Sequence, residues 1–307
     1  MLVGKGGMET LRRVLVHLSK ENSCPQSARF QQSIVGHFSR AHEDSSMVNY
    51  GLDQNRLLIS DQEFLGSRTV LLKRPSFCPI KLLRQDQADS LPAKTQVRGV
   101  DVGVAVLLQS SGRRILLTRR SKALSLFPNV WVPPGGHVEP NEQLLDAGLR
   151  ELQEETGLRL SNGEIAWQTL GLWESVYPPL LSRGLPTHHH VVVYMLLRSP
   201  ESHQQLETRF NPSEAEVSAC AWLDPKVLAA IAATEDGIGT GGQRKVAEDI
   251  PPMVSITEFQ NGCAKTVPIP TATFLNTAPA QGRDVERVST GTKFALRMWL
   301  EALGGAS

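Results

Sequence analysis

The sequence predicts a fold of the α/β (α+β) class, because strand patterns and helix patterns both recur along its 307 residues. Three stretches carry this prediction. Residues 102–108 form an almost continuous apolar run, and residues 115–120 return after a Ser-Ser-Gly turn, as in a β-hairpin. Residues 142–157 repeat apolar side chains at the period of an amphipathic helix. Residues 254–269 hold an Asn-Gly pair between two strand patterns.

We expect three segments along the chain. Residues 1–96 read as a small N-terminal α/β appendage with a linker, residues 97–236 as the main domain, and residues 237–307 as a linker, a hairpin and a C-terminal helix.

Within the appendage, the patterns indicate strands at 13–18 and 56–60, a helix at 26–38 and a polar linker at 84–98. In the main domain and the tail, they indicate strands at 165–177, 188–198 and 217–223, a helix from Pro225 to about Ala233 capped by Asp224, a flexible linker at 236–242 and a helix at 292–303.

Composition excludes some classes of partner. The chain has 32 basic and 31 acidic residues, so its net charge does not favour electrostatic binding to DNA or to an anionic membrane. Its longest apolar run, residues 191–197, is far shorter than the roughly 20 residues that span a bilayer. The four cysteines are widely spaced and no secretory signal pattern is present, so we expect an intracellular, cytoplasmic protein without disulfides. Oligomeric state is not readable from the sequence.

A glutamate-rich helix is the main candidate for a functional element. Glu151, Glu154 and Glu155 are spaced i, i+3 and i+4, so they project from one side of a helix. The opposite side carries an apolar stripe of Leu145, Leu149, Leu152 and Thr156. Asn141 is the expected N-cap and Gly157 the expected C-terminal left-handed residue.

Carboxylates crowded on one helix face repel one another, and Glu142 adds a fourth. Divalent hard cations such as Mg²⁺ or Mn²⁺ relieve this repulsion, because they prefer oxygen ligands and bridge carboxylates to phosphates. The alternative is a solvated acidic face with an ordinary ion pair between Arg150 and Glu154. We interpret Gly148, inside the helix, as room for close packing against a sheet.

The stretch from Gly136 to Leu158 resembles the signature of the Nudix hydrolase family, G-x5-E-x7-R-E-U-x-E-E-x-G-U with U aliphatic, at every defined position. This resemblance implies an α-β-α sandwich with a mixed sheet and metal-dependent hydrolysis of a diphosphate linkage in a nucleoside diphosphate derivative. It implies that Glu151, Glu154 and Glu155 hold Mg²⁺ or Mn²⁺, with Glu151 as an alternative general base. Glu142 would support the metal site, and Arg150 would orient a glutamate.

Three further stretches, residues 131–136, 171–175 and 288–295, resemble one member of that family, and the likeness covers the chain from about residue 75. It implies a capped RNA 5′ end as substrate and a methylated guanosine diphosphate as product. Residues 116–120 resemble coenzyme A diphosphatases, so a nucleotide-type small molecule such as coenzyme A or ADP-ribose is the alternative substrate. An alternative of another class is a catalytically silent binding module on the same fold.

Several residues outside the helix are candidate substrate contacts. Gly135 and Gly136 permit close approach of a phosphate to the backbone. Arg119 and Arg120 point to opposite sides of a strand, and we select Arg119 as a phosphate contact. Glu216 is a candidate base or extra ligand, as in some Nudix proteins. Aromatic side chains could stack on a base, and these are Trp131, Trp167, Trp173 and Tyr177.

The consecutive histidines 188–190 are not expected to bind one ion, because neighbouring residues of a strand face opposite sides.

Overall fold

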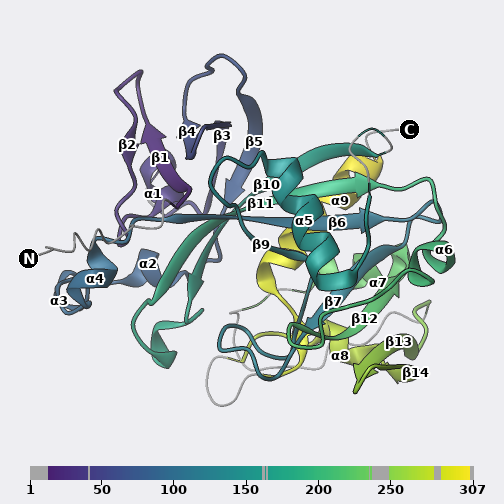
Figure 1. Cartoon of the computed structure of the whole chain (residues 1–307). Helices are drawn as coiled ribbons and strands as arrows, with labels where there is room; N and C mark the ends of the chain where they lie inside the picture. Colours follow the sequence, from purple (N-terminus) through teal and green to yellow (C-terminus); the bar gives the residue numbers. More distant parts are fainter. Residues whose placement is uncertain are drawn as a thin grey trace, which may run out of the picture.

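The computed structural model describes residues 13–40, 42–160, 163, 165–234, 236, 249–279 and 285–304, and every structural statement below refers to these residues. Their strands join in one mixed sheet with the order β14-β13-β12-β7-β6-β11-β10-β5-β3-β4-β1-β2, flanked by helices (Figure 1). The predicted α/β class is therefore confirmed.

The centre of the sheet is built by five strands: β6 (Asp101–Gln109), β7 (Ile115–Arg120), β10 (Ala166–Tyr177), β11 (His188–Arg198) and β12 (Val217–Leu223). β6 and β11 run parallel, while β10 pairs antiparallel with β11 and β12 pairs antiparallel with β7. Strand β6 is buried along its whole length, which explains why its sequence is a continuous apolar run and not an alternating one.

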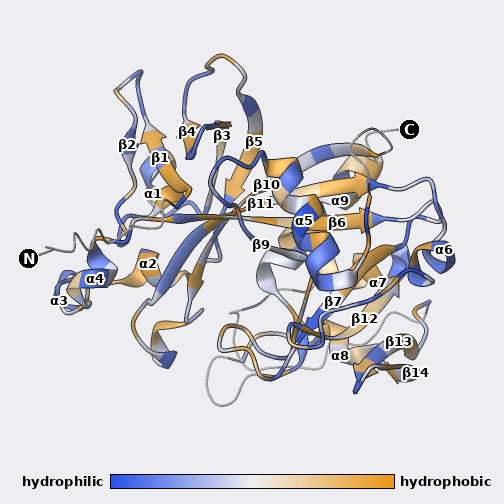
Figure 2. Cartoon of the chain, viewed as in Figure 1, coloured by the Kyte–Doolittle hydropathy of each residue, from blue (hydrophilic) through white to orange (hydrophobic). Residues whose placement is uncertain are grey.

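Helices cover both faces of this sheet. Val104 and Val106 of β6 belong to the core beneath α5 (Leu144–Thr156), whereas Ala105 and Leu107 belong to a second core with α7 (Pro225–Ala232) and α9 (Thr290–Gly304). The alternation of strand side chains thus separates two cores, as the implied α-β-α sandwich requires. Figure 2 shows α5 with both hydrophilic and hydrophobic residues, in keeping with one face on the core.

The N-terminal region extends the same sheet. Its elements are β1 (Leu15–Ser19), β2 (Gln26–Ser27), α1 (Ile34–Phe38), β3 (Ser45–Asp53), β4 (Arg56–Ser60), β5 (Arg68–Lys73), α2 (Pro79–Leu82), α3 (Gln85–Asp89) and α4 (Ala93–Gln96). β5 pairs with β10, and β1 meets β6 at Leu15 and Asp101. The strands from β6 through β11, β10, β5, β3 and β4 to β1 therefore close on themselves.

The predicted helix at 26–38 is wrong for most of its length. Residues 26–27 pair with β1, and the helix begins only after Ser33, whose hydroxyl accepts a hydrogen bond from the Gly36 amide as an N-cap. Sheet pairing therefore overrides the helical pattern before this cap. The stretch at 84–98 holds two short helices, α3 and α4, where a linker was expected.

The C-terminal segment docks on the main body. Its hairpin of β13 (Met253–Gln260) and β14 (Cys263–Pro270) adds to the edge of β12 and turns at Asn261 and Gly262, both with positive φ. The short elements α8 (Ala272–Leu275) and β15 (Arg287–Val288) lead to α9, which packs against α7 and β10. Of the linker predicted at 236–242, only Asp236 lies within the described residues.

The remaining elements are β8 (Val130–Val132), β9 (Gly135–His137), a 3-10 turn at Leu181–Arg183 and α6 (His203–Glu207). All four cysteines carry free thiols, as expected. Among the helices described, none combines the length and the apolar character that a membrane span needs.

Candidate functional site

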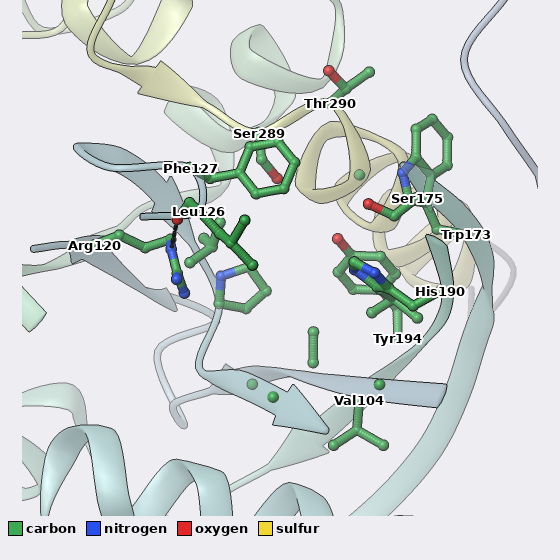
Figure 3. Close-up of a pocket in the computed structure, with 18 of the residues that line it drawn as sticks. Val104, Arg120, Leu126, Phe127, Trp173, Ser175, His190, Tyr194, Ser289 and Thr290 are labelled. Carbon is green, nitrogen blue, oxygen red and sulfur yellow. Dashed lines mark hydrogen bonds between the residues drawn. The ribbon is translucent and has the colours of Figure 1, made fainter. Parts of the chain in front are cut away.

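A cavity of about 550 Å³ opens beside the glutamate-rich helix. Its walls come from α5 and β9, from β10 and β11, from the segment between β7 and β8, and from the beginning of α9 (Figure 3). Pro75, Phe77, Cys78 and Pro79 of the N-terminal region line it as well. Its volume lies within the range of small-molecule sites. This cavity is the candidate active site.

Helix α5 begins later than predicted. Asn141 has a φ of 70° and donates its amide to Asn55, and the N-cap position falls on Gln143. Glu142 therefore precedes the helix and is not in its first turn. The predicted C-terminus is confirmed, because Gly157 adopts φ 78° and donates its amide to the Gln153 carbonyl.

Three glycines fix how closely the helix, β9 and the sheet approach. A β-carbon on Gly136 would lie less than 3.0 Å from three atoms of the Glu151 carboxylate. A β-carbon on Gly135 would overlap the backbone of Val104 on β6. One on Gly148 would lie 2.6 Å from the Met195 Cε atom, so the expected close packing of Gly148 against the sheet is confirmed.

The three glutamates of the signature helix, the box glutamates Glu151, Glu154 and Glu155, differ in their surroundings. Glu155 is buried, with one oxygen accepting from the Gly135 amide at 3.4 Å and the other from the Thr118 hydroxyl at 3.3 Å. Desolvation raises its pKa to about 8, against the opposing charge of Arg120. Desolvation also raises the pKa of Glu151, against its hydrogen bond with Arg150.

Arg150 links the other carboxylates. Its Nε donates to Glu142 at 2.7 Å, and one terminal nitrogen donates to Glu151 at 2.8 Å and to Glu154 at 3.1 Å. The second terminal nitrogen donates to the His137 carbonyl at 2.9 Å, which ties the helix to β9. The hydrogen bond from Arg150 holds the pKa of Glu142 below its usual value. The guanidinium thus fixes the carboxylate geometry.

The donors fit a hard divalent cation in their chemistry, because the acidic end of the cavity offers carboxylate oxygens. Within the described part of the chain, no three His, Cys, Asp or Glu side chains already converge as ligands of one ion. The contacts of Arg150 account for part of this, since they hold Glu151 and Glu154 on its guanidinium. Mg²⁺ completes its shell with water and substrate phosphates and does not require a full protein cage.

The structure separates the predicted substrate contacts into two groups. Trp173 and Glu216 line the cavity together with Gly135, Gly136 and the three box glutamates. Arg119 does not line it, because its guanidinium is held by Glu258 at 2.7 Å and Glu286 at 3.3 Å on the other side of β7. Trp131 does not line it either, since its side chain is fully buried and its Nε1 donates to Glu286.

Arg120 takes the place predicted for Arg119. The two arginines do point to opposite sides of β7, and Arg120 is the one on the cavity side. Its Nε donates to the Leu126 carbonyl at 3.1 Å, which fixes the guanidinium at the cavity wall (Figure 3). Its terminal nitrogens make no hydrogen bond with the described residues. Strand alternation placed the pair on opposite sides but could not tell which arginine faced inward.

Sequence reasoning missed a buried network behind the cavity. Glu174 accepts from the amides of Ile34 and Val35 at 2.8 and 2.9 Å, and its carboxylate lies 3.2 Å from His189 Nε2. Desolvation opposes ionisation of Glu174, but these partners outweigh it and lower its pKa. The network attaches α1 to the sheet beside Trp173. Its partners lie about 140 residues apart, so no local pattern could reveal it.

Phe77, Phe127 and Tyr194 also line the cavity and were not singled out, and His190 was considered only as a metal ligand. His189 is buried and His190 faces the cavity, so the histidines of this strand alternate as expected.

Comparison with known proteins agrees with this geometry. A family model described as NUDIX domain matches residues 97–239. The chain is 55% identical over 296 residues to the m7GpppN-mRNA hydrolase NUDT17 of Xenopus laevis, covering 96% of this chain and 97% of that protein. It is 47% identical over 295 residues to the human protein of the same name, covering 95% and 88%.

Among solved structures, DR0079 from Deinococcus radiodurans is 27% identical and matches with a TM-score of 0.31, over 45% of this chain and 76% of that one.

Proposed function

Because the chain belongs to the Nudix hydrolase family, we propose that it hydrolyses the 5′ cap of RNA and releases N7-methyl-GDP. The observation that carries this proposal is the cavity, which has box glutamates at one end and aromatic side chains at the other. A capped end has a matching arrangement, since a phosphate chain extends from a methylated base. The similarity to m7GpppN-mRNA hydrolases along nearly the whole chain supports the choice of substrate.

Nudix hydrolases use divalent metal ions, and we assign Mg²⁺ or Mn²⁺ to this chain. Glu151, Glu154 and Glu155 would hold the metal. The bound ion would neutralise phosphate oxygens and lower the pKa of water. Glu154 is the most exposed of the three, with 54% of its side chain accessible, and is therefore the one most open to an incoming ion.

Arg150 and Glu142 act as positioning residues in this proposal. The guanidinium fixes Glu151 and Glu154 by charge-assisted hydrogen bonds, and Glu142 fixes the guanidinium from its other edge. The glutamates are thereby held in place before substrate binds, which lowers the cost of ordering them.

Glu216 and Glu151 are the two candidates for the general base. Both line the cavity, and Glu216 comes from the segment just before β12, the strand next to β7 in the sheet. A base must lie within hydrogen-bond reach of the attacking water, so we propose that this water is held at the acidic end of the cavity, beside one of these two carboxylates.

Gly135, Gly136 and Arg120 are proposed to receive the phosphates. The glycines leave the cavity wall open beside the carboxylates, and Arg120 offers terminal N–H donors suited to phosphate oxygens. Desolvation lowers the pKa of Arg120, against the charges of Glu155 and Glu216, and an incoming phosphate would add a negative partner.

The proposal is tested by a hydrolysis screen. Capped RNA, N7-methylated and unmethylated cap dinucleotides, coenzyme A and ADP-ribose are incubated with the protein and Mg²⁺ or Mn²⁺ in ¹⁸O-water, and products are identified by mass spectrometry. We expect N7-methyl-GDP from the methylated cap, with ¹⁸O on the phosphorus that water attacks. Efficient cleavage of coenzyme A or ADP-ribose with no cap hydrolysis would replace the cap by a free dinucleotide as substrate.

The matched control is Glu154→Gln. A protein that binds nucleotides but turns over none of these substrates, and is unchanged by Glu154→Gln, is a binding module and not an enzyme.

The free thiols of all four cysteines agree with an intracellular, cytoplasmic location, which we also propose.

A further inference from the structure

The end of the cavity away from the glutamates is a slot between aromatic side chains. Figure 3 shows Leu126 and Phe127 on one side and Trp173, His190 and Tyr194 on the opposite side. Ser289, just before α9, and Thr290, its first residue, close the slot from above in this view. A slot between rings suits a flat ligand.

The rings around the slot are held in place by neighbours. One face of Trp173 stacks on Phe294 of α9, with centroids 5.3 Å apart and planes 29° apart. Tyr194 meets the same phenylalanine edge to face at 6.3 Å. Phe127 meets Tyr177 edge to face at 4.9 Å. A ligand entering the slot therefore does not pay to order these side chains.

Polar groups of the slot have no protein partner. Three polar groups make no hydrogen bond with any residue that the structure describes: the imidazole of His190, the Nε1 of Trp173 and the hydroxyl of Ser175. Their polar atoms are not among the fully buried atoms that lack a partner. Desolvation lowers the pKa of His190 to about 3, so its ring is neutral and offers one donor and one acceptor. These groups match the hydrogen-bonding edge of a nucleobase.

The carboxylate of Glu174, beside the slot, is already engaged. Glu174, next to Trp173 in sequence, is completely buried on His189 and the amides of α1. The slot thus presents neutral donors and acceptors and π-faces, and the rings attract an uncharged or positively charged base.

The wall formed by α9 lies outside residues 97–239, the segment that the family model matches. Gly291 makes its close approach possible, because a β-carbon there would lie 3.0 Å from the Trp173 ring and closer still to the Tyr194 hydroxyl. The buried ion pair of Lys293 and Asp236, 2.8 Å apart, fixes the start of α9 from behind.

We propose that this slot, completed by the first turn of α9, is the nucleobase subsite, and that Trp173 and His190 determine which base is accepted. The inference rests on the proposed function for the identity of the base, a guanine methylated at N7. The positive charge of that base adds a cation–π attraction to ordinary stacking.

Binding without turnover tests the subsite independently of catalysis. The full chain is titrated with N7-methyl-GMP, GMP, AMP and ribose 5-phosphate by calorimetry, without divalent metal. Ribose 5-phosphate lacks a base and reports phosphate binding alone. We expect wild-type protein to bind N7-methyl-GMP roughly 5- to 100-fold more tightly than ribose 5-phosphate, the effect of stacking one base.

Trp173→Leu should abolish most of this difference, and His190→Phe, which keeps a ring but loses the polar atoms, should reduce the discrimination among the three bases. Trp167→Leu is the matched control, because Trp167 lies on the same strand but lines a different pocket under Arg68. It should bind like wild type. Circular dichroism and thermal melts identify any variant that fails to fold, and in that case His190→Phe alone decides.

The outcomes distinguish this inference from the proposed function. Base preference that persists in both Trp173→Leu and His190→Phe overturns the subsite, whatever the protein hydrolyses. Cap hydrolysis by wild type with an unchanged KM in Trp173→Leu leaves the proposed function standing and removes the subsite. Base-dependent binding that these variants abolish, in a protein without cap hydrolysis, leaves the subsite standing and removes the proposed function.

Discussion

Replacing Gly136 by alanine tests the placement of Glu151 with a single added methyl group. An ideal β-carbon at position 136 lies 2.6 Å from the Glu151 Oε2 atom and nearer still to Oε1, whereas ordinary contact begins at 3.4 Å, so the carboxylate must move by about 1 Å. The φ angle of Gly136 is not in the left-handed region, so alanine meets no backbone strain there. The perturbation is therefore confined to Glu151 and its partner Arg150.

A displacement of about 1 Å in a catalytic group costs on the order of 10²-fold in rate. We expect kcat for the best substrate of the screen to fall by this factor, about 2.7 kcal/mol in activation free energy, with little change in melting temperature. The assay is product formation under saturating substrate and metal, followed by a thermal melt of the same sample.

Two other glycines are the controls. Gly148→Ala presses on Met195 and Val106 and should cost about 1–3 kcal/mol of stability by overpacking, with turnover per folded molecule retained. Gly112→Ala meets no atom within 4 Å and should change neither quantity. Wild-type kcat in Gly136→Ala would refute the argument that this contact holds Glu151 in its working position.

Four further outcomes are expected. Glu154→Gln should lower turnover by orders of magnitude with an intact fold, and a chelator should do the same to wild type; equal activity with and without chelator would contradict the metal assignment. Arg150→Lys should lower kcat roughly 10-fold or more, because an ammonium cannot reproduce the planar fork that bonds several carboxylates; full activity would show that charge alone suffices. Glu174→Gln should cost about 2–3 kcal/mol in urea unfolding, since it weakens buried hydrogen bonds made to a charged group, and an unchanged midpoint would show that the network is not needed. The depressed pKa of His190 means that the unfolded chain binds this proton below about pH 6.5 while the folded chain does not. Stability should therefore fall as pH drops from 6.5, by at most about 1.4 kcal/mol per unit. His190→Phe should flatten this part of the profile, and identical slopes would contradict a neutral ring at position 190.

The sequence predicted the parts of the structure that depend on local spacing. The box helix, its end at Gly157, the Asn-Gly hairpin and the helix capped by Asp224 follow from residues a few positions apart, and the structure confirms them. Gly148 was also correctly interpreted, because a glycine inside an amphipathic helix has few explanations other than close packing.

Features that depend on distant partners were missed. The helix predicted from residue 26 fails because β1 captures residues 26–27, and β3 and β5 were not predicted at all. Asn141 was mistaken for a cap, since its competing partner, Asn55, is 86 residues away. The division of the chain at residues 96 and 236 stays a prediction, although the strands on either side of residue 96 share one sheet.

Side-chain direction was the other limit within the site. Trp131 and Trp173 are both tryptophans within strands, yet the Nε1 of Trp131 donates to Glu286 in the interior and Trp173 lines the cavity. Periodicity assigns neighbours to opposite faces but does not say which face is hollow.

The hairpin that pairs with β12 affects how the chain can be truncated to residues 97–239, the segment that the family model matches. Without the hairpin, such a fragment would expose the backbone hydrogen-bonding groups of β12. Without α9, it would also expose the apolar surface that Trp299 and Phe294 cover. Both changes favour self-association. The fragment would keep the box glutamates but would lack the first turn of α9, which covers Trp173. Shortened versions should therefore precipitate readily, and any that stay dispersed should cleave pyrophosphates with little regard for the attached group.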